Sequence, residues 1–229
     1  MREIVLDTET TGFDPEKGDR IVEIGAVELF NHLPTGQTFH RYLNPDRAMP
    51  EDAFKVHGLS DAFLADKPRF SDVAADLLAF VADAPLVIHN AAFDMRFLNA
   101  EFGWQRLPPI PLDRAVDTLA IARRRFPGAQ ASLDALCRRF GIDTSARTLH
   151  GALLDSQILA EVYLELIGGR QPNLVLSASG PARNATGVAG PGDGRLRARP
   201  AALPARLTPQ EAADHATFVA TLAGGGLWE

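Results

Sequence analysis

The chain has 229 residues, of which 46% are hydrophobic and 23% charged, enough for one well-buried domain with a smaller part beside it. Its formal charge of −6 argues against holding nucleic acid through the overall field, so nucleic-acid chemistry would need metal ions, a local basic patch or a partner. The single cysteine, Cys137, excludes an internal disulfide. The sequence has no charged start followed by a long apolar run, so we expect no signal peptide and no membrane span.

The first 170 residues carry a dense pattern of strands followed by helices. Three strands joined by short polar or glycine-containing turns predict an antiparallel meander: residues 2–7, 21–30 and 37–43. A short buried strand is expected at 85–90, and helical spacing of apolar residues covers 70–83, 90–103 with Asn90 as its N-cap, 117–127, 132–141 and 153–169. The order predicts an α/β fold, a mixed sheet flanked by helices.

The composition changes after this domain. Residues 177–206 are rich in Ala, Gly, Pro, Ser and Arg without an aromatic residue, which is typical of a flexible linker. Thr208 and Glu211 then form a capping-box pattern that opens a short helix. Such a helix cannot fold alone. Its apolar residues Phe218, Val219 and Leu222, with Leu227 and Trp228 after a glycine stretch, either pack back on the domain or, as the linker favours, dock on another protein.

Two carboxylates stand at the end of the first strand, in VLDTETTG. Asp7 and Glu9 point to one face of the strand and Thr8 to the other, which holds two like charges close together. Such a pair repels unless a proton or a cation lies between its members, although an isolated pair of this kind is also common at a frayed strand end.

Two further carboxylates occupy inward positions on predicted helices. Asp94 lies beside the apolar stripe of its helix, and Asp155 is followed by apolar residues three, four and seven positions on. A buried Asp can be a structural cap or half of an ion pair. Four carboxylates without an obvious Lys or Arg partner nearby in sequence are costly to cluster unless divalent cations bind between them.

His150 precedes Asp155 by five residues, a spacing that would put the two on separate faces of one helix. They converge if His150 stands in the loop ahead of the helix. A neutral histidine beside metal-bound water is a natural general base, whereas a structural role is the commoner use of a histidine before a helix.

Three segments resemble the motifs of the DEDDh exonuclease family, in the family's order: DTETTG with Asp7 and Glu9, HNAAFD ending at Asp94, and HGALLD from His150 to Asp155. The resemblance covers residues 1 to about 170 and implies a ribonuclease H-like fold. It also implies that the four carboxylates hold two divalent ions, Mg²⁺ or Mn²⁺, that His150 deprotonates the attacking water, and that a 3′-terminal nucleoside monophosphate is released.

The segments VHGL, LVIHNAAFD, FPG and SLDALC resemble more narrowly the proofreading exonuclease subunits of bacterial replicative DNA polymerases. This resemblance implies a cytoplasmic protein that acts on a DNA 3′ end beside the polymerase catalytic subunit. It also implies that Asp52 and His57, together with Asp7, Glu9 and Asp155, contact the terminal nucleotide; a structural loop histidine is the alternative for His57.

Residues 171–176 carry a further short pattern. Gln171, Leu174 and Leu176 resemble the peptide with which polymerase subunits bind the sliding clamp, and a plain helix exit is the alternative. The tail, residues 207–229, is then expected to bind the polymerase catalytic subunit.

The sequence leaves three functions open. The first is a 3′–5′ exonuclease that removes mispaired nucleotides, and the second is a relative that trims RNA or degrades oligonucleotides with the same five residues. The third is a non-catalytic adapter that joins polymerase and clamp. The intact five-residue set argues against the adapter, and the linker with its terminal helix argues against a free-standing RNA-trimming enzyme.

Overall fold

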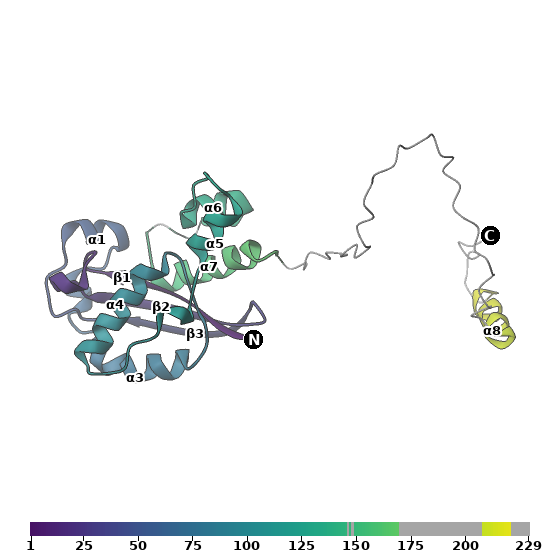
Figure 1. The fold of residues 1–229 in the computed structure, drawn as a ribbon, viewed down its shortest axis with the longest axis horizontal. Helices are drawn as coiled ribbons and strands as arrows, with labels where there is room; N and C mark the ends of the chain where they lie inside the picture. Colours follow the sequence, from purple (N-terminus) through teal and green to yellow (C-terminus); the bar gives the residue numbers. More distant parts are fainter. Residues whose placement is uncertain (146, 148, 170–207, 221–229) are drawn as a thin grey trace, which may run out of the picture. The chain divides into compact units, whose positions relative to one another are not determined.

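The computed structural model describes residues 1–145, 147, 149–169 and 208–220 (Figure 1). The chain divides into two units, Met1–Leu176 and Ser177–Glu229, and each is described by itself. The predicted clamp-binding residues, the predicted linker, Leu222 and Trp228 lie outside the described residues, so these predictions stay predictions.

The first unit is built on one five-stranded sheet of order β3-β2-β1-β4-β5. β1 pairs with β2 and β2 with β3 in antiparallel fashion, whereas β1, β4 and β5 run parallel. The strands are β1 Arg2–Thr10, β2 Ile21–Phe30, β3 Leu33–Tyr42, β4 Leu86–Ile88 and β5 Ala115–Asp117. The predicted meander and the mixed sheet are therefore confirmed.

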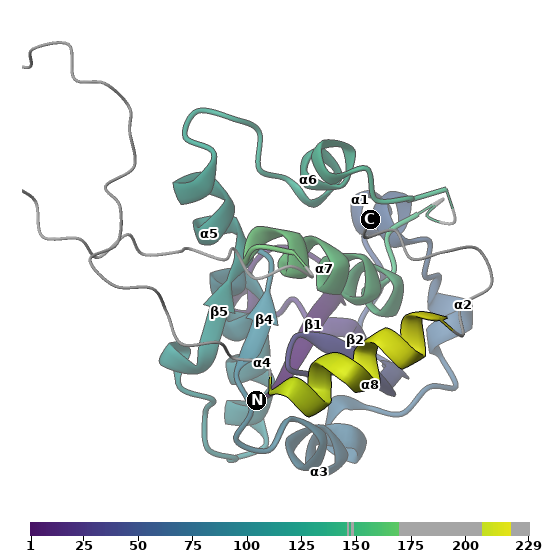
Figure 2. The ribbon, with the colours of Figure 1, turned by 90° about the vertical axis from the view of Figure 1, so that its right-hand side faces the viewer.

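Helices cover both faces of this sheet, and α3 and α4 lie on the side opposite α5, α6 and α7 (Figures 1 and 2). Their bounds are α1 Glu51–His57, α2 Asp61–Leu64, α3 Phe70–Val81, α4 Ala91–Trp104, α5 Thr118–Arg125, α6 Leu133–Phe140 and α7 Ala152–Leu166, with 3-10 turns at Pro15–Lys17 and Leu112–Arg114.

Side chains of β1 alternate between the two faces of the sheet, and the core accordingly has two layers. Ile4 and Leu6 pack with α3 and α4, whereas Val5 packs with α5, α6 and α7. Cys137 is buried in the second layer, as its place between apolar helix positions predicts. The two faces of one strand thus contact two different sets of helices.

The second unit contains α8, Pro209–Ala220. Glu211 N donates to Thr208 Oγ1 at 3.3 Å and Thr208 N donates to the Glu211 carboxylate at 2.8 Å, which confirms the predicted capping box. Phe218 is 61% exposed and Val219 is partly buried. Among the described residues, no helix combines the length and apolar composition needed to cross a bilayer.

Candidate active site

The carboxyl ends of the parallel strands meet at one edge of the sheet, where α/β folds commonly place their sites. A cavity of about 570 Å³ opens there, lined by residues that end or follow β1, β4 and β5. All five predicted catalytic residues contribute to its walls: Asp7, Glu9, Asp94, His150 and Asp155. The folded chain therefore brings together side chains that are far apart in sequence, with 148 positions separating Asp7 from Asp155.

Asp94 is held by the residue between the two strand carboxylates. Thr8 lies on the face of β1 opposite Asp7 and Glu9, and its backbone N and Oγ1 donate to Asp94 Oδ1 at 3.1 and 2.7 Å. Asp94 occupies the first turn of α4 and is 3% exposed. Asn90 begins this helix as predicted, but in a left-handed conformation without a side-chain cap, and its backbone N donates to Asp117 Oδ1.

Asp155 reaches the cluster because α7 begins directly on the sheet. Gly25 on β2 pairs with Asp7 on β1, and a Cβ at Gly25 would lie 2.1 Å from the backbone N of Leu153 and 2.2 Å from the carbonyl carbon of Ala152. Ser156 Oγ also donates to the Gly25 carbonyl at 2.9 Å. The absence of a side chain at Gly25 thus permits the first turn of α7 to lie beside Asp7.

His150 stands in the loop immediately before α7, the placement that lets it converge with Asp155. Its Nδ1 lies 3.1 Å from Asp155 Oδ2, and the backbone N of His150 donates to the Val56 carbonyl at 3.2 Å. The side chain is 48% exposed, so the imidazole lies between the carboxylates and solvent.

An arginine occupies the centre of this group. Arg147 approaches Asp155 in a fork, with Nε 2.6 Å from Oδ1 and Nη2 2.7 Å from Oδ2, and Nη2 also lies 2.7 Å from His150 Nδ1. It forms a further ion pair with Asp134, and its side chain is only 8% exposed. The prediction that the carboxylates lack a nearby basic partner is therefore wrong, because the guanidinium of Arg147 reaches Asp155 from eight positions earlier in the chain.

Sequence reasoning missed several members of the cavity wall, among them Arg147 and His89. Arg147 was missed because a charged residue in a loop gives no periodic signal, although its place just ahead of an inward-facing acidic helix residue could have indicated an ion pair. His89 follows β4, and its Nδ1 lies 2.9 Å from Thr118 Oγ1, which ties the end of β4 to the start of α5. Burial lowers the pKa of His89, so the imidazole is neutral near pH 7.

The clustered carboxylates favour a bound proton or cation. Burial, followed by the neighbouring Asp94 and Glu9, raises the pKa of Asp7 well above its usual range. Burial, followed by Asp155, Glu23 and Asp94, raises the pKa of Glu9 to about 8. Burial likewise raises the pKa of Asp94, against the opposing hydrogen bonds from Thr8. One arginine therefore does not neutralise this group.

A pH titration of stability should report this repulsion. The Glu9 carboxyl stays protonated to about pH 8 in the folded protein, whereas the unfolded chain ionises near 4.5. The protonated Glu9 carboxyl thus adds its full stabilisation to the free energy of unfolding below about pH 4.5. This stabilisation decreases as the pH rises and is lost above about pH 8. Urea unfolding of metal-free protein should show this decline, and Glu9→Gln should flatten it; a stability that rises with pH across the window would contradict the assignment.

The donors of the cluster fit a divalent cation. Ligand atoms of Glu9, His150 and Asp155 all lie within 4.8 Å of one another. The oxygen-rich set formed with Asp7 and Asp94 is the one that Mg²⁺ and Mn²⁺ prefer. The charge and the chemistry of the cluster thus agree with metal binding.

Asp52 and His57, two of the predicted nucleotide contacts, line a second cavity of about 580 Å³, which shares Thr8, Glu9 and Phe93 with the first. Asp52 is fully exposed on its wall, and His57 is 6% exposed at the end of α1, where its Nδ1 accepts a hydrogen bond from Leu59 N at 3.1 Å. The structure thus places both residues next to the five-residue site but not inside it, and their contact with a nucleotide stays a prediction.

Comparison with known proteins gives consistent matches. The Exonuclease family (RNase_T) matches residues 4–163. The chain is 56% identical over 174 residues to the DNA polymerase III subunit epsilon of Rickettsia felis, covering 75% of this chain and 76% of that protein. It is 50% identical over 196 residues to the same subunit of Escherichia coli, covering 82% and 80%.

Solved structures agree with the fold. Exonuclease X, in complex with 5′ overhanging duplex DNA, is 28% identical with a TM-score of 0.56 and covers 72% of this chain and 90% of that one. The nuclease domain of 3′hExo, a DEDDh family member bound to rAMP, is 20% identical with a TM-score of 0.63 and covers 72% and 91%.

The sheet order, the flanking helices and these matches define an exonuclease with a ribonuclease H-like fold, and the donors of its cavity fit divalent metal ions. Within that class, the chain belongs to the family of DNA polymerase III epsilon subunits. The sequence-based prediction of a proofreading 3′–5′ exonuclease is thereby confirmed.

Proposed function

We propose that the chain removes mispaired nucleotides from the 3′ end of DNA, that Asp7, Glu9, Asp94 and Asp155 hold two Mg²⁺ or Mn²⁺ ions, and that His150 is the general base. The convergence of these five side chains in one cavity carries the proposal. When bound, divalent ions supply Lewis-acid activation of water and neutralise charge on the phosphodiester.

The chain's own residues orient the reaction around that cluster. Thr8 fixes Asp94 through two hydrogen bonds, and Gly25 fixes the position of Asp155 by admitting the first turn of α7. His150 is half exposed and lies beside Asp155, which supports its role in accepting a proton from water on the solvent side. The position of Asp52 and His57 on the wall of the adjoining cavity supports their contact with the terminal nucleotide.

Primer extension and digestion assays test the function directly. A labelled DNA primer with a mismatched 3′ end should be shortened faster than its matched counterpart, because an unpaired end enters a single-strand site at a lower unpairing cost. The preference should increase when the polymerase catalytic subunit is present. Faster degradation of an RNA oligonucleotide than of the DNA strand would favour the RNA-trimming alternative instead.

Substitution of the proposed base gives a pH-resolved prediction. His150→Ala should lower turnover by about 10²-fold or more while metal ions still bind. The wild-type rate should rise with pH over the range in which an imidazole loses its proton, and the variant should lack that rise. A profile that keeps its shape in the variant would remove His150 from this role.

The residues that follow α7 give a prediction about partners. We propose that residues 207–229 bind the alpha subunit of DNA polymerase III in the bacterial cytoplasm through Phe218, Val219, Leu222 and Trp228, and that Gln171, Leu174 and Leu176 bind the sliding clamp. Deletion of residues 181–229 should leave hydrolysis of single-stranded oligonucleotides near the wild-type rate but abolish co-purification with the alpha subunit. A truncated chain that still binds at nanomolar concentrations, about 12 kcal/mol, would place the main contact on the nuclease domain.

A further inference from the structure

Five arginines gather on two helices beside the candidate active site. Arg123, Arg124 and Arg125 form the last turn of α5, and Arg138 and Arg139 form the last turn of α6. All five are exposed. Residues 118–141 contain only one carboxylate, Asp134, although the chain as a whole carries a formal charge of −6. We call these five residues the arginine face.

Phe126 joins the two helices into one surface. The guanidinium carbon of Arg139 lies 4.4 Å from the centre of its ring and that of Arg125 lies 5.6 Å from it. Arg125 is further anchored by donating to the carbonyls of Glu165 and Leu166 at 2.7 and 2.5 Å. Phe126 therefore holds Arg125 and Arg139 together where α5 and α6 end.

The arginine face continues into the active-site cavity. Arg123 lines that cavity together with Ser132 and Leu133, which start α6, and with the predicted catalytic carboxylates. A strand whose last nucleotide occupies the cavity can thus leave it along the arginine face. Positive charge beside an acidic site suits a polyanion whose chain extends beyond the reacting end.

We propose that the arginine face binds the phosphates of the DNA strand upstream of its 3′ end. This inference rests on the proposed function, because it concerns the same substrate at the same site. Arginines also stabilise helix carboxyl ends through the helix dipole, a structural role that would explain their positions without DNA. The two explanations differ in their effect on substrate length and salt, and the test uses both.

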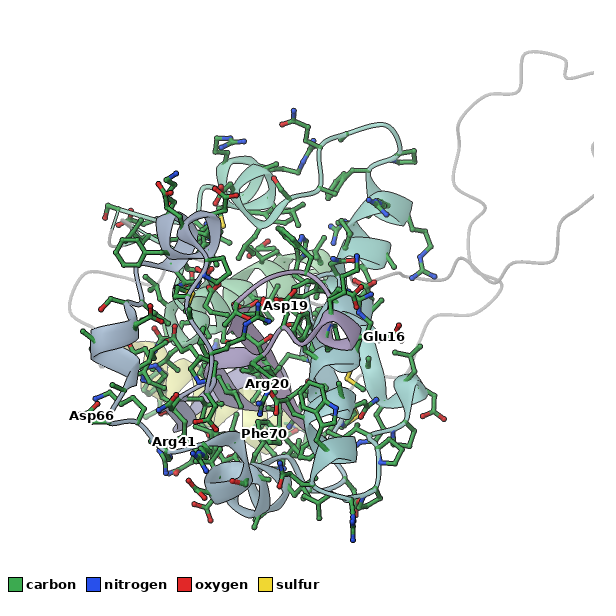
Figure 3. All side chains as sticks on the ribbon, turned by 90° about the vertical axis from the view of Figure 1, so that its left-hand side faces the viewer. Glu16, Asp19, Arg20, Arg41, Asp66 and Phe70 are labelled. Atoms are coloured by element: carbon green, nitrogen blue, oxygen red, sulfur yellow. The ribbon has the colours of Figure 1, made fainter. Side chains whose placement is uncertain are left out.

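The variant Arg124→Gln with Arg138→Gln removes two exposed charges and keeps Arg123, which lines the cavity, and the two arginines that pack on Phe126. The matched control, Arg41→Gln with Arg69→Gln, removes two charges elsewhere. Arg41, labelled in Figure 3, packs on Phe39, which belongs to the core layer of α3. Arg69 immediately precedes α3. Both control residues thus lie on the side of the sheet away from the arginine face.

The full chain is assayed on single-stranded DNA of about 15 nucleotides and on a dinucleotide, and anisotropy measures binding of the labelled longer strand. The ratio of KM for the longer strand to KM for the dinucleotide should rise about tenfold in the arginine-face variant and stay at the wild-type value in the control. The slope of log Kd against the logarithm of the salt concentration should decrease by about 0.7 for each lost phosphate contact.

Three outcomes would overturn the inference: an equal change on both substrates, an unaltered salt slope, or an equal loss in the control. A lower melting temperature of the arginine-face variant without a change in the KM ratio would show that the arginines only stabilise the helix ends. If neither substrate is hydrolysed, the proposed function fails, whereas the anisotropy result still decides whether the arginine face binds DNA.

Discussion

Asp7→Asn should abolish metal-dependent hydrolysis and at the same time raise the melting temperature of the metal-free protein. Burial and three neighbouring carboxylates oppose the Asp7 charge, and its amide counterpart removes that repulsion without changing the shape of the side chain. The rate should fall by about 10³-fold or more, since one of the four proposed metal ligands is lost. Each kcal/mol of relieved repulsion should raise the melting temperature by about 2–4 °C.

Asp155→Asn is the matched comparison, because it should lose the same activity with the opposite effect on stability. Arg147, which is nearly buried, would keep Asp134 but lose its ion pair with Asp155, including the hydrogen bond from Nη2 to Oδ2. Leaving a buried charge with fewer partners destabilises by a few kcal/mol at most. Calorimetry without metal should therefore place the two variants on opposite sides of the wild type, and the same sign for both would contradict the described ion pair.

Gly25→Ala should inactivate the enzyme although Gly25 carries no functional group. A Cβ would lie within 2.4 Å of backbone atoms of Ala152 and Leu153, and backbone at a helix start cannot rotate away as a side chain can. We expect α7 to shift outward, taking Asp155 and His150 with it, at a cost of about 1–3 kcal/mol or more in stability. A displacement of 1 Å in such a site costs about 10²-fold in rate.

Gly103→Ala is the control for Gly25→Ala, because Gly103 also lies in a regular element and a Cβ there meets no atom within 4 Å. The control should keep wild-type activity and gain slightly in stability, since alanine favours a helix more than glycine does. Full activity in Gly25→Ala, measured with single-stranded DNA, would show that the contact between β2 and α7 does not position the site.

The predicted part of the site follows from periodic patterns. Alternation along β1 put Asp7 and Glu9 on one face and Thr8 on the other, and the structure shows why both faces matter, since Thr8 holds Asp94. The inward positions of Asp94 and Asp155 were visible because each lies next to apolar residues at helical spacing, and both are 3% exposed. Long, strongly periodic segments thus located four of the five residues.

Three short elements of the nuclease unit, α1, α2 and β5, were not predicted, whereas the equally short β4 was recognised as a continuous apolar run. α1 and α2 span 7 and 4 residues and β5 spans 3, so none repeats an apolar position often enough to be recognised. The contact between Gly25 and the start of α7 was also hidden, because a glycine in a strand indicates close approach of some backbone but not which one. Arg147 was missed for the related reason that loop charges pair through tertiary structure.

Anomalous diffraction from crystals containing Mn²⁺ and thymidine monophosphate, a reaction product, would locate the metal ions at the site. We expect two manganese peaks in contact with Asp7, Glu9, Asp94 and Asp155, with the Arg147 guanidinium moved away from Asp155. Manganese density bound elsewhere, with Arg147 still forked on Asp155 and the cavity without the nucleotide, would contradict the assignment of these residues as the catalytic metal site.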